Sequence, residues 1–382
     1  ERVMNFQFSE TQQMMRDMAR DFATKELAPI AAQIDQEERI PAEIIEKMAG
    51  IGFTALNIPE EYGGAGLDTV CKVLVVSELA RQCASTAEVI SVHTLANDIF
   101  IKHGTEAQKE KYLKAAVEGK IGAFALTEPG AGSDAAAAKT KAEVDGDDYI
   151  INGTKCFISN MGPTEGDFVV VIALTDPEKG TKGMSAIVVD RGTPGFTVGK
   201  REEKMGIRGA DISELIFEDC RVPRSNLIGQ EGQGFKIAMS ALDGGRIGMA
   251  AQALGISDAA IAASVKYMGE RVQFGKPIGK NQGLQWYLAD MATRTEAAWA
   301  LVLEAACAAD SGAPLSKLAA MCKYFASENA VWVTNKALQI HGGYGYMRDY
   351  PIERMYRDAR IVPIYEGTSE VQKMVIAREV MK

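Results

Sequence analysis

The sequence has 382 residues, of which 47% are hydrophobic and 24% charged, so it is long enough for two or three domains. Its formal net charge of −9 offers no basic excess to neutralise phosphates, which argues against a nucleic-acid-binding protein. It contains no CxxC pair, no histidine cluster and no run of about 18 apolar residues, which indicates reduced thiols, no metal site and no membrane span.

Residues 1–120 are predicted to form a helical domain. Ser9 with Gln12 and Thr105 with Gln108 have the spacing of capping boxes, in which each side chain bonds the backbone N–H of the other residue. Apolar residues at helical spacing follow the first of these boxes. We therefore expect several helices in this part of the chain.

Residues 121–230 are predicted to form a β domain. Runs of β-branched residues follow one another here without intervening helical patterns, so we expect an antiparallel sandwich or barrel rather than a βαβ array. The turn Asp145-Gly146 joins the first two predicted strands. The predicted strands lie around 144, at 149–151, 168–174, 184–189 and 214–217.

Residues 231–382 are predicted to form a helix bundle. Ala, Leu and Met dominate long stretches, as is typical of bundles. The first helix has one expected break, at Asp243-Gly244-Gly245, because glycine costs about 1 kcal/mol relative to alanine inside a helix. The predicted helices span 234–267, 282–309, 314–340 and 368–381.

Two stretches of the β domain carry candidate ligand contacts. Phe124–Ser133 meets the loose G-x-G-x-x-A pattern, but a hairpin follows it, so we reject a dinucleotide-binding βαβ unit. Its backbone N–H groups and hydroxyls could still hold a ligand; a plain surface turn is the alternative. Phe157 could stack on a flat ring system, although most strand phenylalanines belong to the core.

Three stretches of the helical region are further candidates. The pair Gly244-Gly245 suggests close approach of a ligand, with Asp243 and Arg246 beside it; the alternative is a kink with a structural ion pair. Arg271 could bind a pyrophosphate, or neutralise its own helix C-terminus. The stretch 339–346 has three glycines within four residues, more than a helix cap requires.

Glu366 is the candidate catalytic residue. It precedes Gly367 and Thr368, a residue type that caps helices, so its carboxylate should lie on a tight turn ahead of a helix N-terminus. A carboxylate shielded from water there could have its pKa raised from about 4.3 toward 6–7, the range of a general base. An ordinary acid in a capped loop is the alternative.

Together these stretches resemble the acyl-CoA dehydrogenase family over essentially the whole chain, and most closely its short-chain and butyryl-CoA dehydrogenase group. The matching motifs are FALTEPGAGSD, CFISN, KMGIRGA, ALDGGRIG, ERVQFGKPIG, QIHGGYGY and IYEGTSEVQ. The resemblance implies an N-terminal helical domain, a middle antiparallel β domain and a C-terminal four-helix bundle. It also implies bound FAD, a homotetramer built as a dimer of dimers, and electron-transfer flavoprotein as acceptor.

The resemblance assigns the site residues. It places FAD contacts at Phe124, Leu126, Thr127, Gly132, Ser133, Phe157, Ile158, Ser159, Arg271, Phe274, Gln282, Gln339, Gly342, Gly343, Thr368 and Glu370. The stretch from Arg271 onward to Gly343 would serve the FAD of a neighbouring subunit. Substrate contacts fall at Ser133, Asp243, Gly244, Arg246, Tyr365 and Gly367.

The implied mechanism is dehydrogenation of a short or compact acyl-CoA to the enoyl-CoA. Glu366 would take the α-proton while a β-hydride passes to flavin N5, and the Glu366 N–H would stabilise the thioester oxygen. A minority of the family carry this carboxylate at the position of Gly245, and glycine cannot serve. A bacterial cytoplasmic location is expected, or the mitochondrial matrix if a presequence has been removed.

Glu88 departs from the family pattern, which usually has an apolar residue near the distal end of the acyl pocket. It could be a second acid/base, suited to a cyclic carboxyl-CoA; the alternative is a capping box formed by Ser85 and Glu88. An acyl-CoA oxidase is another alternative, disfavoured because oxidase chains are usually much longer. A FAD-free binding homologue is the non-enzymatic one.

Overall fold

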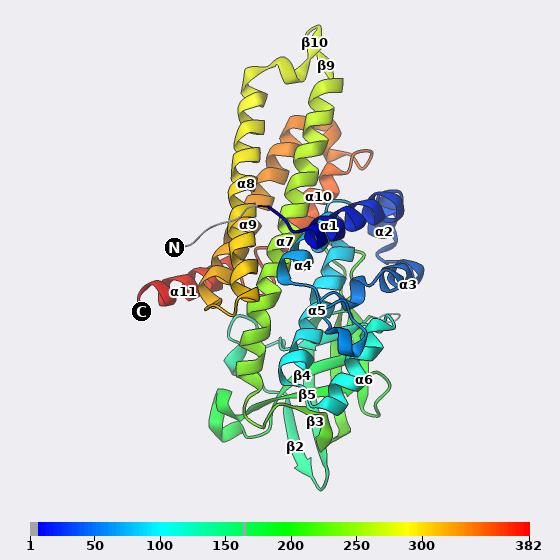
Figure 1. Cartoon of the computed structure of the whole chain (residues 1–382), viewed down its shortest axis with the longest axis vertical. Coiled ribbons are helices and arrows are strands. Elements are labelled where there is room, and N and C mark those ends of the chain that lie inside the picture. Colours follow the sequence, from blue (N-terminus) through cyan, green and yellow to red (C-terminus); the bar gives the residue numbers. More distant parts are fainter. Residues whose placement is uncertain (1–6, 163–165) are drawn as a thin grey trace.

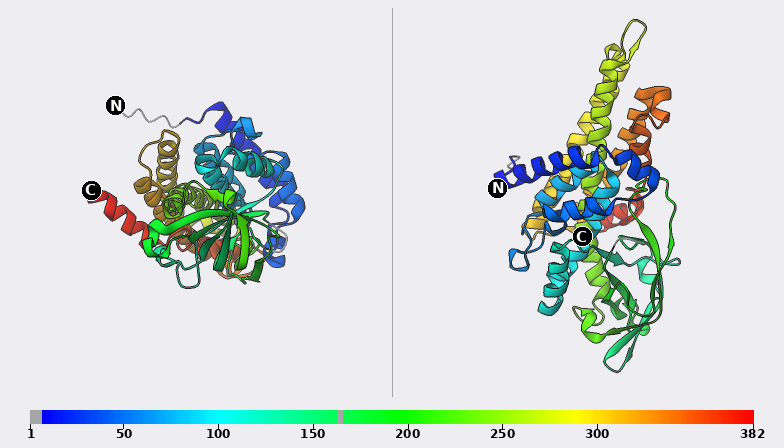
Figure 2. Two further views of the ribbon diagram at one scale, coloured as in Figure 1. Left: turned by 90° about the horizontal axis from the view of Figure 1, so that it is seen from below. Right: turned by 90° about the vertical axis from the view of Figure 1, so that its right-hand side faces the viewer.

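The computed structural model describes residues 7–162 and 166–382. A helical region, a β region and a second helical region follow one another along the chain, as the sequence predicted. The β region forms one end of an elongated molecule, the first helices lie beside its middle, and two long helices extend to the opposite end (Figure 1, Figure 2).

The N-terminal helices begin where the sequence places their caps. Ser9 and Thr105 each form a complete capping box, which confirms both predictions. Helices α4 and α5 are buried on nearly every face because they lie between the other N-terminal helices and the C-terminal ones. The helices are α1 (Glu10–Phe22), α2 (Ala31–Glu37), α3 (Ala42–Gly50), α4 (Thr69–Ala80), α5 (Ala84–His103) and α6 (Glu106–Val117).

The β region is a largely antiparallel sheet with the strand order β6-β7-β3-β2-β4-β5-β8, and β1 pairs with β4. Strands β1 and β2 run parallel to β4, and the other pairs are antiparallel. The predicted hairpin at Asp145-Gly146 joins β2 to β3. The strands are β1 (Gly122–Ala125), β2 (Lys141–Asp145), β3 (Asp148–Ser159), β4 (Phe168–Leu174), β5 (Met184–Asp190), β6 (Phe196–Arg201), β7 (Ile212–Pro223) and β8 (Leu227–Ile228).

The C-terminal region contains three long helices and two shorter ones. A small hairpin, β9 (Val272–Gln273) with β10 (Lys276–Pro277), joins α7 to α8 at the far end of the molecule (Figure 1). Helix α10 was not predicted. The helices are α7 (Gly234–Glu270), α8 (Gln282–Asp310), α9 (Ser316–His341), α10 (Ile352–Ala359) and α11 (Ser369–Val380).

The predicted break in the first long helix is wrong, because α7 runs without interruption through Asp243-Gly244-Gly245. Asp243 and Arg246 form an ion pair at 2.6 Å across one turn of this helix. Helix α7 is long and apolar enough to cross a membrane by composition, but 78% of its most apolar window is buried inside the protein. It is therefore a core helix, against which α4, α5 and α9 pack.

Candidate active site

Glu366 lies on the tight turn that the sequence predicted, immediately before α11. Its φ is +51°, a left-handed conformation that is uncommon for residues other than glycine, and Gly367 continues the turn with φ +93°. Thr368 caps α11 by accepting a hydrogen bond from the Val371 N–H. The turn brings the Glu366 carboxyl group back toward α7.

The Glu366 side chain is half-buried beside α7. Its Oε2 is inaccessible to solvent and has no hydrogen-bond partner among the described residues. Burial raises the pKa of Glu366 to about 7, although the charges of Lys323 and Arg246 act to lower it. A carboxyl group with this pKa can exchange a proton near neutral pH, as a general base must.

Gly245 provides the space that the Glu366 carboxyl group occupies. A Cβ atom built on Gly245 would lie 2.2 Å from Glu366 Oε2 and 2.7 Å from Leu95 Cδ1. No side chain could stand at position 245 without displacing Glu366 or Leu95. The glycine therefore serves close packing of α7 against the turn, and it does not break the helix.

Glu88 on α5 is a second buried carboxyl group. It is fully buried; its Oε1 accepts the Ser159 hydroxyl at 2.5 Å and its Oε2 has no partner among the described residues. Burial raises its pKa to about 7, against the opposing effects of Ser159 and Lys204. The predicted capping box is wrong: α5 begins at Ala84, and the Ser85 hydroxyl accepts the Gly209 N–H instead.

Tyr365 lies close enough to both carboxyl groups for their charges to act on it. Its hydroxyl donates to Gln252 Oε1 on α7. Burial raises the pKa of Tyr365 well above its usual value, and the nearby charges of Glu88 and Glu366 add to the rise. The charge of Glu88 also raises the pKa of Glu366. The three side chains therefore belong to one site between α5, α7 and the turn.

A buried ion pair holds the glycine-rich loop after β1 in place. The sequence did not reveal this pair. Lys155 Nζ lies 2.8 Å from Glu128 Oε1 and donates to the Leu126 carbonyl at 3.0 Å. Glu128 also accepts the N–H groups of Lys139 and Thr140. Within and beside this loop Leu126 and Ile158 are buried, Phe124, Thr127 and Ser159 are half-buried, and Gly132 and Ser133 are exposed.

Phe157 is not a core residue. It has φ +57° at the end of β3, and 64% of its surface is exposed. The core alternative from the sequence is therefore wrong for this residue. An aromatic ring presented in this way, with the half-buried Ser159 close by in sequence, suits contact with a flat ring system.

Asp243 and Arg246 form the ion pair of the structural alternative, but without the kink that it included. The ion pair is present, and the Ser316 hydroxyl donates to Asp243 at 2.6 Å. Arg246 Nε is nevertheless buried without a partner among the described residues, so one donor remains for a ligand. A Cβ atom built on the predicted contact Gly244 would lie 3.4 Å from Asp98 Oδ2. The predicted contact Glu370, in the first turn of α11, is exposed.

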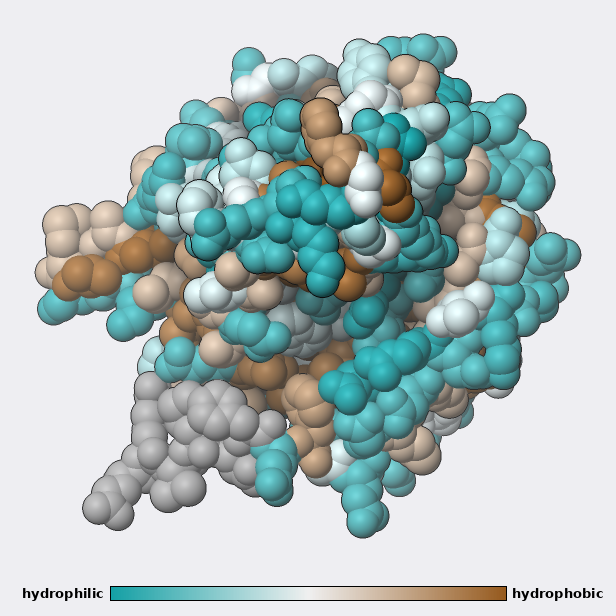
Figure 3. Space-filling view, turned by 90° about the horizontal axis from the view of Figure 1, so that it is seen from above, coloured by the Kyte–Doolittle hydropathy of each residue, from teal (hydrophilic) through white to brown (hydrophobic). Residues whose placement is uncertain are grey.

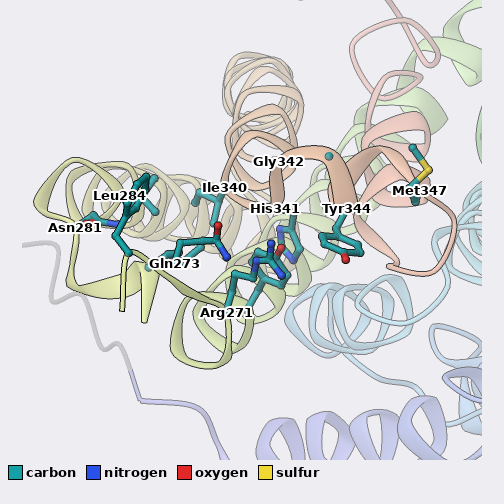
Figure 4. Close-up of a pocket in the computed structure, with 13 residues that line it drawn as sticks. Arg271, Gln273, Asn281, Leu284, Ile340, His341, Gly342, Tyr344 and Met347 are labelled. Carbon is teal, nitrogen blue, oxygen red and sulfur yellow. The ribbon is translucent and has the colours of Figure 1, made fainter. Parts of the chain in front are cut away.

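The remaining predicted cofactor residues gather at the far end of α7. Arg271, Phe274, Gly342 and Gly343 line a cavity of about 670 Å³ there (Figure 4). The Arg271 guanidinium lies over the Tyr344 ring, 5.1 Å from its centroid. The predicted contacts Gln282 and Gln339 are exposed near this cavity but do not line it.

The structure thus places the predicted residues in two separate groups. Arg246 and Arg271 are 25 residues apart on one continuous helix and its cap, which corresponds to about 40 Å along the axis. The predicted cofactor contacts around Arg271 therefore lie far along α7 from Gly245, against which the Glu366 carboxyl group packs.

Comparisons with known proteins match the whole chain. Family models described as the N-terminal, middle and C-terminal domains of acyl-CoA dehydrogenase match residues 9–120, 123–220 and 232–381. The acryloyl-CoA reductase (NADH) of Anaerotignum propionicum is 59% identical over 382 residues, covering 99% of this chain and 96% of the relative. The short-chain specific acyl-CoA dehydrogenase of Clostridium acetobutylicum is 49% identical, covering 99% of this chain and 100% of the relative.

Solved structures agree with these matches. Butyryl-CoA dehydrogenase from Megasphaera elsdenii superimposes with a TM-score of 0.97 at 46% identity, covering 99% of this chain and 100% of that chain. A structure described as the electron transferring flavoprotein of Acidaminococcus fermentans matches with TM-score 0.97, 50% identity and the same coverages. The prolyl acyl carrier protein oxidase AnaB matches with TM-score 0.94 at 33% identity, covering 98% and 100%. This oxidase chain is matched over its whole length, so the length of the present chain does not exclude an oxidase.

Proposed function

The chain belongs to the acyl-CoA dehydrogenase family of FAD-binding oxidoreductases, and we propose that it dehydrogenates a short or compact acyl-CoA with Glu366 as the base. One observation carries this assignment: a buried carboxyl oxygen without a partner, on a strained turn, packed against a glycine of α7. A purely structural carboxylate in such a position would be hydrogen-bonded.

The residues around Glu366 fit a flavin ring. Phe157 presents an exposed aromatic ring, Thr127 is half-buried, and the oxygen of the Ser159 hydroxyl, which donates to Glu88, could still accept a hydrogen bond. Bound FAD would supply the acceptor for the hydride that leaves the substrate β-carbon. At the other end of α7, Arg271 offers the guanidinium donors that a pyrophosphate needs, and Gly342 and Gly343 line the same cavity.

Glu366 has two tasks in this proposal. Its carboxylate removes the proton next to the thioester carbonyl, for which a pKa of about 7 is suited. Among the described residues no backbone carbonyl accepts the Glu366 N–H, so this donor is available to the thioester oxygen as negative charge develops. Arg246 Nε is a further donor for the polar part of the substrate.

Close packing between α5 and α7 supports a small acyl group. Gly245 contacts Leu95, and a Cβ atom on Gly248 would lie 3.3 Å from Ser91 Oγ, so the two helices leave little room for a long chain. Glu88, also on α5, is fully buried.

We also propose that the molecule works as a homotetramer and exchanges electrons with electron-transfer flavoprotein. The separation of the two groups along α7 supports the first part, because Arg271 can then contact the FAD of another subunit. The end that carries the β9–β10 hairpin presents apolar side chains among hydrophilic ones (Figure 3), including Phe274, which is 99% exposed. The match to an electron transferring flavoprotein structure supports the second part.

A second candidate is the reverse reaction, reduction of a 2-enoyl-CoA, which the 59% identity to an acryloyl-CoA reductase favours. The same carboxyl group would then donate the α-proton, since a catalyst accelerates both directions of a reaction. A third is use of Glu88 as a second acid/base on a cyclic carboxyl-CoA, favoured by its unpartnered buried oxygen.

Bleaching of the bound flavin tests these candidates. Straight, branched and cyclic acyl-CoAs are each added without oxygen, and the dithionite-reduced protein is titrated with 2-enoyl-CoAs. We expect the fastest bleaching with short straight chains; no bleaching by any acyl-CoA, or a colourless protein, would contradict the proposal. Rapid peroxide release in air would assign an oxidase, and an unchanged preference in Glu88→Val would remove the second-base candidate.

A further inference from the structure

Lys323 on α9 is a buried cation directly behind the Glu366 turn. Its side chain is fully buried and its Nζ donates to the Gly367 carbonyl at 2.7 Å. Among the described residues no carboxylate lies within ion-pairing distance of it. Burying an ammonium group without a counter-ion is costly, so its retention here needs a compensating role.

Two side-chain donors, Gln372 and Lys323, hold the backbone carbonyls of the turn. Gln372 Nε2 donates to the carbonyls of Glu366 and Gly367 at 3.2 and 2.9 Å, and Lys323 Nζ also binds the Gly367 carbonyl. These bonds oppose relaxation of the left-handed Glu366 conformation, which is strained for a residue with a side chain. Because the Glu366 and Gly367 carbonyls are held by these hydrogen bonds, the Glu366 carboxyl group stays beside Gly245.

Of the three cations that act on Glu366, Lys323 is also the one without an ion pair to a described carboxylate. The charged groups that face Glu366 are Lys323 from α9, Arg246 from α7, Glu88 from α5 and Lys72 from α4. Arg246 is paired with Asp243 at 2.6 Å and Lys72 with Asp98 at 3.6 Å. Lys323 itself faces Glu366, Arg246, Glu328 and Glu370.

We propose that Lys323 is a positioning residue, whose ammonium group anchors the Gly367 carbonyl and places a positive charge without an ion-pair partner near the Glu366 carboxylate. The proposal rests on the role of Glu366 as base. Lys323 does not touch the substrate in this account; it acts through the turn and through charge.

The direction of the effect follows from electrostatics. A nearby cation stabilises the carboxylate, so Lys323 lowers the pKa of Glu366, while burial raises it to about 7. Burial lowers the pKa of Lys323 to about 8, and Glu366 opposes that change. Removing the charge should therefore raise the Glu366 pKa further and reduce the fraction of active carboxylate at neutral pH.

The test compares Lys323→Met with Gln372→Leu, which removes an anchor but no charge. The first readout is the pH midpoint of flavin bleaching by butyryl-CoA in each holoenzyme. The second is the carboxyl infrared band of Glu366, assigned by its loss in Glu366→Gln. For Lys323→Met we expect both midpoints to rise by about one pH unit or more; for Gln372→Leu, slower bleaching with an unchanged midpoint.

Lys323→Arg, which keeps the charge, should keep the wild-type midpoint. Lys323→Gln, which keeps a donor without the charge, repeats the test if the Met variant does not fold. A wild-type midpoint in a folded, FAD-loaded Lys323→Met or Lys323→Gln protein would overturn the proposal. If Glu366→Gln itself bleached at the normal rate, the assignment of the base would fail instead, so the two failures are distinguishable.

Discussion

At the residue scale, the site depends on two carboxyl groups buried in different surroundings. Glu366 Oε2 has no partner among the described residues and faces α7, whereas Glu88 is tied through one oxygen to the Ser159 hydroxyl. Burial raises the pKa of each to about 7. Both groups therefore change charge close to neutral pH, and the stability of the fold should depend on pH there.

Glu88→Gln should stabilise the protein at alkaline pH. A folded-state pKa above the usual value of 4.5 means that unfolded Glu88 ionises first, so its contribution to stability falls as pH rises from about 4.5 through 7. Glutamine cannot ionise, so we expect a gain of about 1–3 kcal/mol near pH 8 and little change near pH 5. Thermal unfolding at both pH values measures this, with the exposed Glu118→Gln as control; equal shifts at both would contradict it.

At the element scale, local signals predicted the caps at Ser9, Thr105 and Thr368 and the strands β2, β3, β4, β5 and β7, but they could not predict contacts that depend on tertiary packing. Ser9, Thr105 and Thr368 cap helices through residues three positions away, which a sequence displays directly. The continuity of α7 through its glycine pair depends on α5 and the Glu366 turn, which are distant in sequence. Lys323 and Gly367 are 44 residues apart, and no periodicity shows that they meet.

Gly245→Ala should lower activity without breaking α7. Its Cβ atom would lie 2.2 Å from Glu366 Oε2, so the carboxyl group must move, and a displacement of about 1 Å can cost about 100-fold in rate. Alanine also favours helix relative to glycine. Flavin bleaching measures the loss, with Gly269→Ala as control, because a Cβ there meets nothing within 4 Å. Equal activity of the two variants would count against the packing argument.

At the scale of the whole molecule, α7 separates the carboxyl site from the cavity that contains Arg271 (Figure 4). The sequence supplied both groups of residues but not their separation, because it does not show that the helix between them is unbroken. In the tetramer that we propose, the Arg271 cavity of one subunit would contact the FAD of another.

Arg271→Ala should weaken FAD binding while leaving the Glu366 site intact. Loss of a charge-assisted contact to a pyrophosphate corresponds to about 1.5–3 kcal/mol, or about 10- to 100-fold in affinity. The FAD-to-protein ratio after gel filtration measures this, and light scattering reports the oligomer. A flavin content and affinity equal to those of the wild type would show that Arg271 binds no FAD.

The most direct test of the account is the pH dependence of flavin bleaching by butyryl-CoA in the wild type and in Glu366→Gln. We expect a wild-type midpoint near the Glu366 pKa of about 7. In the variant, which keeps FAD and binds the thioester normally, we expect the bleaching rate to fall by about 10²- to 10⁴-fold. A near-normal rate in Glu366→Gln would contradict the assignment of this carboxylate as the base.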